Sequence, residues 1–150
     1  MTTINGVEGA KALAGQDWGT STWIEVTQEQ VNTFADATGD HQWIHVDVER
    51  AKEGPFGGPI AHGFLTLSLI PVLYHDVVHL EGFPMAVNYG LNKVRFPSPV
   101  PVGSKLRAQV RNVSVEDVKG GVQVTNQITI EIEGGAKPVC VAEFVTRLFA

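Results

Sequence analysis

The run Val122-Gln123-Val124-Thr125-Asn126-Gln127-Ile128-Thr129-Ile130-Glu131-Ile132 alternates in polarity. Counted from Val122, every second residue is apolar, with Asn126 as the one exception. Successive side chains of a β-strand point to opposite faces, so this period of two predicts a strand with one packed face and one face toward solvent. Three more segments share the alternation: residues 85–96, 104–115 and 139–148. Glycine pairs at 120–121 and 134–135 separate the last three strands, which predicts antiparallel hairpins.

One long helix is predicted ahead of these strands. Residues 63–79 are apolar on nearly all sides, as expected for a helix wrapped by a larger element, and Pro71 should kink or interrupt it. An antiparallel sheet against one buried helix is an α+β arrangement. The chain has 150 residues, so we expect a single domain over residues 1–150 that buries roughly 70% of the unfolded surface. Residues 1–19 form a weakly patterned lead-in, and residues 22–26 favour a short strand.

A second helix is indicated by its two boundaries. Thr27 and Gln30 have the spacing of a capping box, in which each side chain bonds the backbone of the other residue. Gly39 is a typical left-handed stop, because glycine adopts that conformation without steric cost. Asp40 therefore lies just beyond a helix end.

An acid and an imidazole occur together in the turn that follows, Gly39-Asp40-His41-Gln42-Trp43-Ile44-His45-Val46-Asp47. Asp47 can cap another short helix that runs to residue 53, which leaves His45 in the ordered link between two helices. A Gly/Pro-rich loop, residues 54–59, then leads into the apolar helix. We expect the turn, the loop and the helix N-terminus to converge on one pocket.

Charge and cysteine content exclude several classes of protein. The net charge is −5 with no cluster of Lys and Arg, which gives no electrostatic footprint for nucleic acid. We find no secretion signal in the first twenty residues, and polar residues break the apolar stretch 64–78, so we expect no membrane insertion. Cys140 is the single cysteine and lies in an alternating strand, which favours a packed thiol and a cytoplasmic location.

Two motifs resemble those of the MaoC-like (R)-specific enoyl-CoA hydratase family: the turn over residues 39–47 and the run Gly58-Pro59-Ile60-Ala61-His62-Gly63. The loop at residues 95–100 extends the likeness over nearly the whole chain. The resemblance implies a hot-dog fold, in which a curved antiparallel sheet wraps around a central helix. It also implies a homodimer, and substrates that are acyl thioesters of coenzyme A or of an acyl carrier protein. Many members have Asn-Pro where this chain has Gln42-Trp43.

The resemblance further implies roles for individual residues. Asp40 and His45 are expected to act on a water molecule, and the Gly63 N–H is expected to donate to the thioester oxygen. We expect His62, Gln42 and Ala61 to belong to the same substrate-binding site.

The chemistry explains why few residues suffice. Water adds to C3 of a 2-enoyl thioester if it is activated, if C2 receives a proton, and if the negative charge on the thioester oxygen is stabilised. Asp40 can accept a proton from the water and His45 can hold the same water; a positioned acid/base group typically contributes ~10²–10⁴-fold. A free N–H at a helix start can stabilise the oxygen. No metal ion or organic cofactor is required.

Other interpretations remain open at this point. An acyl-thioester hydrolase on the same scaffold would use a similar water and acid, because fold alone does not fix the reaction. A non-catalytic acyl-binding subunit of a dehydratase complex would keep the fold as well. Asp40 taken alone could be an ordinary turn residue. His75 and His79 lie one helical turn apart, as in a zinc helix, but the glutamate of that motif and a third ligand are missing.

Overall fold

A six-stranded antiparallel sheet is the main element of the structure, a computed structural model that describes all 150 residues. The strand order is β2 (Asp17–Thr20), β6 (Lys105–Val118), β7 (Gly121–Ile132), β8 (Cys140–Phe149) and β5 (Met85–Arg95), with β3 (Ile24–Glu25) paired to β6. Every pair is antiparallel. The four long strands are confirmed with ends that differ by a few residues, and β3 lies within the predicted segment 22–26.

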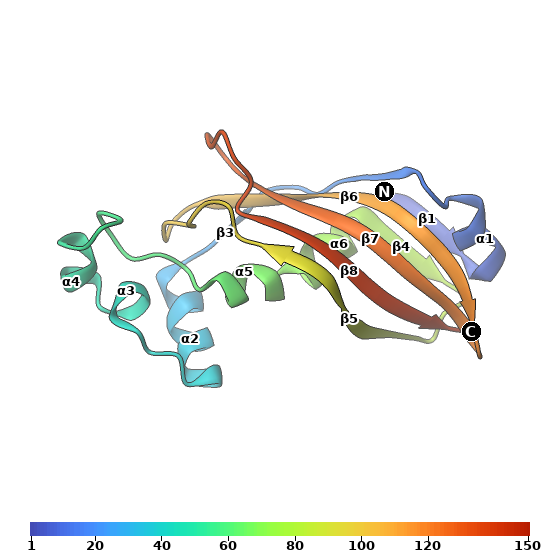
Figure 1. Cartoon of the computed structure of the whole chain (residues 1–150), viewed down its shortest axis with the longest axis horizontal. Coiled ribbons are helices and arrows are strands. Elements are labelled where there is room, and N and C mark those ends of the chain that lie inside the picture. Colours follow the sequence, from blue (N-terminus) through green and yellow to red (C-terminus); the bar gives the residue numbers. More distant parts are fainter.

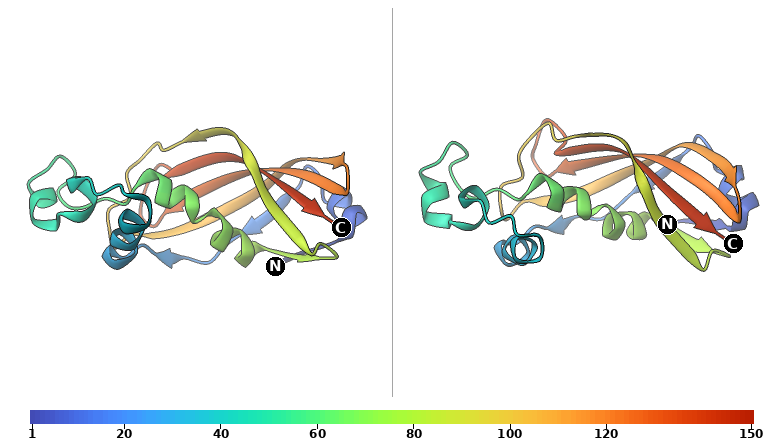
Figure 2. Two further views of the ribbon diagram at one scale, coloured as in Figure 1. Left: turned by 90° about the horizontal axis from the view of Figure 1, so that it is seen from below. Right: turned by 60° about the horizontal axis from the view of Figure 1, so that its bottom comes forward.

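Six helices accompany the sheet: α1 (Gly6–Ala12), α2 (Gln28–Thr38), α3 (Trp43–Val46), α4 (Val48–Lys52), α5 (Gly63–Ser68) and α6 (Ile70–Val77). α5 and α6 run along one face of the sheet, whereas α3 and α4 project beyond one of its ends (Figure 1). Figure 2 shows the sheet curving over α5 and α6, which confirms the predicted α+β arrangement. No helix is long and apolar enough to cross a membrane.

The central helix is interrupted, as Pro71 predicts. Leu69 separates α5 from α6, and Pro71 occupies the first turn of α6, where its missing N–H breaks the bonding to the preceding turn. The helix ends at Val77, so the expected end near residue 79 is wrong. The reason is tertiary, since Val78 has extended backbone and pairs with Thr2 of the N-terminal strand β1 (Thr2–Asn5).

Most of the first twenty residues form helix or strand, and the expectation of a weakly patterned lead-in is wrong. They form β1, α1 and β2, and β1 pairs in parallel with β4 (Val78–Glu81) as a separate sheet. Ile4, Ala10 and Trp18 are buried there, and the Trp18 indole donates to the Leu13 carbonyl at 2.9 Å. The partner of β1 is far along the chain, so periodicity within the segment could not reveal it.

The alternation of β7 is realised in the core. Four of its side chains have no exposed surface: Val122, Val124, Ile128 and Ile130. They belong to one cluster of 26 buried residues. Asn126 occupies the polar place in this row, and its side-chain oxygen accepts a hydrogen bond from Asn112 Nδ2 at 2.9 Å. This bond gives the buried side-chain oxygen the partner it needs, whereas the buried Asn126 Nδ2 has no partner within the chain.

Candidate active site

The Asp40 carboxylate is presented by a helix end. α2 begins at the Thr27 cap, whose hydroxyl accepts from the Gln30 N–H at 3.2 Å, and it stops at Gly39, which has a φ of 84°. The Thr27 cap and the Gly39 stop confirm the predicted boundaries, but the other half of the capping box is not formed, because the Gln30 side-chain oxygen has no partner. Asp40 follows on an exposed turn, where its carboxylate accepts from the Gln42 N–H at 3.3 Å. The turn is an Asx-type turn, so it orients the carboxylate.

His45 lies in the short helix α3, which forms the predicted ordered link between α2 and α4, and it is buried. Its Nδ1 is 2.6 Å from the Ile60 carbonyl oxygen. A carbonyl can only accept, so Nδ1 carries the proton, and in the neutral ring Nε2 is left with a lone pair. The His45 ring is therefore set in the tautomer that can accept a hydrogen bond from water.

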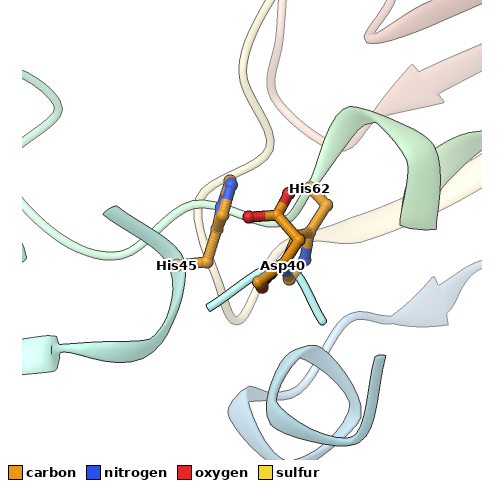
Figure 3. A group of neighbouring side chains, drawn as sticks. All are labelled: Asp40, His45 and His62. Carbon is orange, nitrogen blue, oxygen red and sulfur yellow. Dashed lines mark hydrogen bonds between the residues drawn. The ribbon is translucent and has the colours of Figure 1, made fainter. Parts of the chain in front are cut away.

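His62 connects the acid and the imidazole. Its Nε2–H donates to the Asp40 backbone carbonyl at 2.9 Å, and its ring stacks on the His45 ring with a centroid separation of 3.9 Å and an interplanar angle of 25°. Figure 3 shows the Asp40 side chain beside both imidazoles.

The side chains of Asp40, His45 and His62 come close to one another at one point of the site. A carboxylate oxygen of Asp40 and one ring nitrogen each of His45 and His62 all lie within 4.8 Å of one another. Hydrogen bonds to water have lengths of roughly 2.7–3.0 Å, so one water can bond Asp40 and His45 at once. The sequence-predicted pair is thus brought together in space.

Gly63 lies at the start of α5 and faces the same cavity as His45. The cavity has a volume of about 360 Å³, and its lining includes His45, Ile60, Ala61, Gly63, Thr66 and Phe96. The Gly63 N–H donates to no group in the chain, as expected for the first residue of a helix. A Cβ at this position would lie 3.2 Å from the Phe96 ring, so glycine keeps the N–H accessible from the cavity.

Ala61 and Gln42 can contribute less to substrate binding through their backbone N–H groups than Gly63 can. The Ala61 N–H donates to the Val100 carbonyl at 2.8 Å, so it is not free for a substrate oxygen, although Ala61 does line the cavity. Gln42 is exposed and supports Asp40 through its backbone N–H. Substrate contacts of Ala61, Gln42 and His62 stay predictions.

A metal ion fits this site poorly. Asp40, His45 and His62 are the chain's one group of three potential ligands. A metal must lie in the plane of each imidazole that binds it, at about 2.0–2.1 Å from the nitrogen. Two rings stacked at 25° have nearly parallel planes, so their lone pairs do not converge on one point. His75 and His79 belong to no such group.

Gln28 also supports the site, although no pattern in the sequence singles it out. Its side-chain Nε2 donates to the His45 carbonyl at 2.9 Å and to Asn32 Oδ1 at 3.0 Å, which ties α2 to α3. Gln28 lies in the first turn of an amphipathic helix, where a polar residue is ordinary. No local signal distinguishes it from a solvent-facing side chain.

Cys140 is a packed strand thiol, as predicted, and burial raises its pKa to about 11. Only the thiolate is nucleophilic. A rise from 9.0 to about 11 lowers the thiolate population about a hundredfold below pH 9. We therefore expect iodoacetamide at pH 8 to alkylate the native protein at least about a hundredfold more slowly than the urea-unfolded chain.

The same shift has a consequence for stability. The folded chain keeps the Cys140 proton to higher pH than the unfolded chain does. The contribution of Cys140 to the free energy of unfolding is therefore fully present below pH 9 and is lost as pH rises toward 11. For the alkylation experiment, equal rates for the native and the unfolded protein would contradict the burial of Cys140.

A curved sheet around α5 and α6, with its polar site at one end, is the architecture of a hot-dog protein. Residues 10–132 match the family described as MaoC like domain, and the chain belongs to that family.

Individual relatives agree with this assignment. The chain is 58% identical over 151 residues to 3-hydroxyacyl-thioester dehydratase Z of Mycobacterium tuberculosis, with 100% of both chains covered. It is 43% identical over 142 residues to Nodulation protein N of Rhizobium meliloti, covering 89% of this chain and 85% of that one. The solved (R)-hydratase from A. caviae is 26% identical and superposes with a TM-score of 0.74, over 90% of this chain and 96% of that one.

Proposed function

We propose that this enzyme reversibly hydrates trans-2-enoyl thioesters of coenzyme A or of an acyl carrier protein to (R)-3-hydroxyacyl thioesters. The observation that carries the proposal is the approach of the Asp40 carboxylate and a His45 ring nitrogen to within 4.8 Å, beside a cavity that contains the free Gly63 N–H. The names of the dehydratase and (R)-hydratase relatives support the reaction and its stereochemistry.

Asp40, His45 and Gly63 each take part in the proposed reaction. His45 Nε2 accepts a hydrogen bond from the water, and Asp40 accepts a proton from it as the water oxygen bonds to C3 of the substrate. The electrons of the C2–C3 double bond move toward the thioester oxygen, where the Gly63 N–H stabilises the negative charge. Asp40 then delivers the proton to C2, which restores the carbonyl. The same steps in reverse release water.

The acid/base group and the oxyanion donor are expected to contribute to the rate by comparable factors. A positioned acid/base group supplies ~10²–10⁴-fold in rate, and one oxyanion donor about 10²–10³-fold. α5 has only six residues, so we assign the oxyanion stabilisation to the N–H itself and little of it to a helix dipole, which grows with the number of aligned peptides.

Incubation with crotonyl-CoA and longer 2-enoyl-CoAs tests the proposal. We expect the enoyl absorbance to fall without release of free thiol, and the activity to survive treatment with a chelator. Release of thiol would indicate the hydrolase instead. No turnover of any enoyl thioester would favour the non-catalytic acyl-binding subunit.

We also propose that two copies of the chain pair along β5. This strand bonds only to β8, so its other edge is free. Large apolar side chains are exposed along it: Met85, Val87, Tyr89 and Leu91. A free apolar edge favours pairing with another strand, and two identical edges can pair around a two-fold axis. A cytoplasmic location is proposed as well, supported by the single free cysteine.

The dimer can be checked by sedimentation. The protein is expected at about twice its 16.2 kDa chain mass at micromolar concentration. Leu91→Asp places a charge on this edge and should shift the protein toward monomer. Val113→Asp is the control, because Val113 is similarly exposed, at 51% against 42% for Leu91, but lies on β6. A wild-type protein that sediments only as a monomer would refute the pairing.

A further inference from the structure

His62 is the buried residue that contacts both members of the proposed pair. It is 2% exposed, donates to the Asp40 carbonyl and stacks on the His45 ring. We propose that His62 is a positioning residue that sets the distance between the Asp40 carboxylate and His45 Nε2. This inference rests on the proposed function, since it assigns His62 a task within that reaction.

The Asp40 backbone depends on His62 for its place. Asp40 lies on an exposed turn, directly after the left-handed Gly39. Its carbonyl accepts a hydrogen bond from His62 and from no other group in the chain. Without that bond, the turn that carries the carboxylate is attached to the protein only through its neighbours along the chain. His62 therefore restrains the one part of the pair that burial does not hold.

The His45 ring is held by His62 on one face. The Ile60 carbonyl fixes one edge of this ring, but a single hydrogen bond leaves the ring free to tilt. His62 prevents that tilt by stacking at 3.9 Å, and the Phe34 ring of α2 lies 4.8 Å from His62. The positions of Asp40 and His45 thus both depend on the side chain of His62.

The ring N–H of His62 is engaged within the chain. Its Nε2–H donates to the Asp40 carbonyl, and its Nδ1 is buried without a partner. A buried acceptor without a donor lowers stability, so packing alone does not favour histidine here. This arrangement is explained if the Nε2–H and the flat ring serve the geometry of Asp40 and His45.

Two substitutions separate the contributions of His62. H62F keeps an aromatic ring against His45 but removes the donor to Asp40, whereas H62Q keeps a donor near the position of Nε2 but removes the ring. We expect H62F to lower kcat by about 10²-fold, the effect of a misplacement on the order of 1 Å, with little change in KM. H62Q should be at least about tenfold faster than H62F, because the bond to the Asp40 carbonyl is retained.

Thermal stability distinguishes positioning from packing. H62F removes the unpartnered Nδ1, and water can reach the carbonyl of the exposed Asp40, so its melting temperature should stay close to that of the wild type. A purely structural His62 gives the opposite result, with a lower melting temperature and a normal kcat. His79→Gln, at an exposed histidine on β4, is the matched control and should change neither quantity.

The decisive measurement is a double-mutant cycle with Asp40→Asn. If His62 acts through Asp40, H62F should change the rate of the D40N protein by less than about threefold, because the group it positions is already disabled. An equal loss in both backgrounds overturns the inference, as does a folded H62F with kcat within about twofold of wild type. If H62F does not fold, H62L replaces it in the cycle, and a folded H62Q as slow as D40N also overturns the donor role.

Failure of the inference and failure of the proposed function give different results. A slow D40N with a fully active H62F removes only the role of His62. A D40N protein with wild-type activity shows that Asp40 is not catalytic, and the positioning role is then refuted with it.

Discussion

Asp40→Asn should fold normally and hydrate 2-enoyl thioesters more slowly by about 10²–10⁴-fold. Asparagine has nearly the same shape, and its side-chain oxygen can still accept from the Gln42 N–H that orients Asp40 now. It cannot accept a proton from water, so the loss should appear in kcat. Asp40 is exposed, and the loss of its charge should therefore change the melting temperature little. Steady-state hydration kinetics and thermal unfolding of the purified variant test both statements.

The chain offers a matched control in Asp36. This residue lies in the last turns of α2 and is 78% exposed, so Asp36→Asn removes the same charge a short distance from Asp40. We expect wild-type kinetics for it. A well-folded Asp40→Asn protein with near wild-type turnover would contradict the proposed mechanism, even though the chain has dehydratase relatives.

His45→Gln is expected to have the second large effect, a fall in kcat of about 10²-fold or more. The substitution removes the Nε2 lone pair that holds the water. His45 is also buried and bonded to Ile60, so this variant should unfold at a lower temperature than the wild type. The rate must therefore be expressed per folded molecule, at a temperature below the transition.

The double variant tests whether Asp40 and His45 act on one water. Residues that work as a unit lose much less together than the product of their single losses. We expect the Asp40→Asn/His45→Gln protein to be only slightly slower than the slower single variant. Losses that multiply would indicate independent roles and would contradict the shared water.

The strands could be predicted because their cause is local. Each long strand has one buried face, and the side-chain period of two records that burial directly in the sequence. The ends of α2 were predictable for the same reason, since the Thr27 cap and the Gly39 stop satisfy backbone groups within a few residues. These signals need no knowledge of distant parts of the chain.

The order of the strands has a different origin. β5 precedes β6 along the chain but pairs with β8, while β6 pairs with β2, β3 and β7. The alternation of polar and apolar residues predicts which face of a strand is buried. It does not predict which strand pairs with it through hydrogen bonds. The N-terminal residues were misjudged on the same ground, because β1 is stabilised by β4 and Ile4 by the common core.

For the candidate site, the residue types and the turn that carries Asp40 and His45 were determined by the sequence alone, through helix boundaries and a likeness of motifs. Tertiary structure decided the contacts that make the turn a site. His62 lies 22 residues from Asp40 and meets its carbonyl, Ile60 selects the tautomer of His45, and the Ala61 N–H is occupied by Val100. Such bonds join segments whose separation along the chain carries no period, so they form only when packing of the sheet around α5 and α6 brings those segments together.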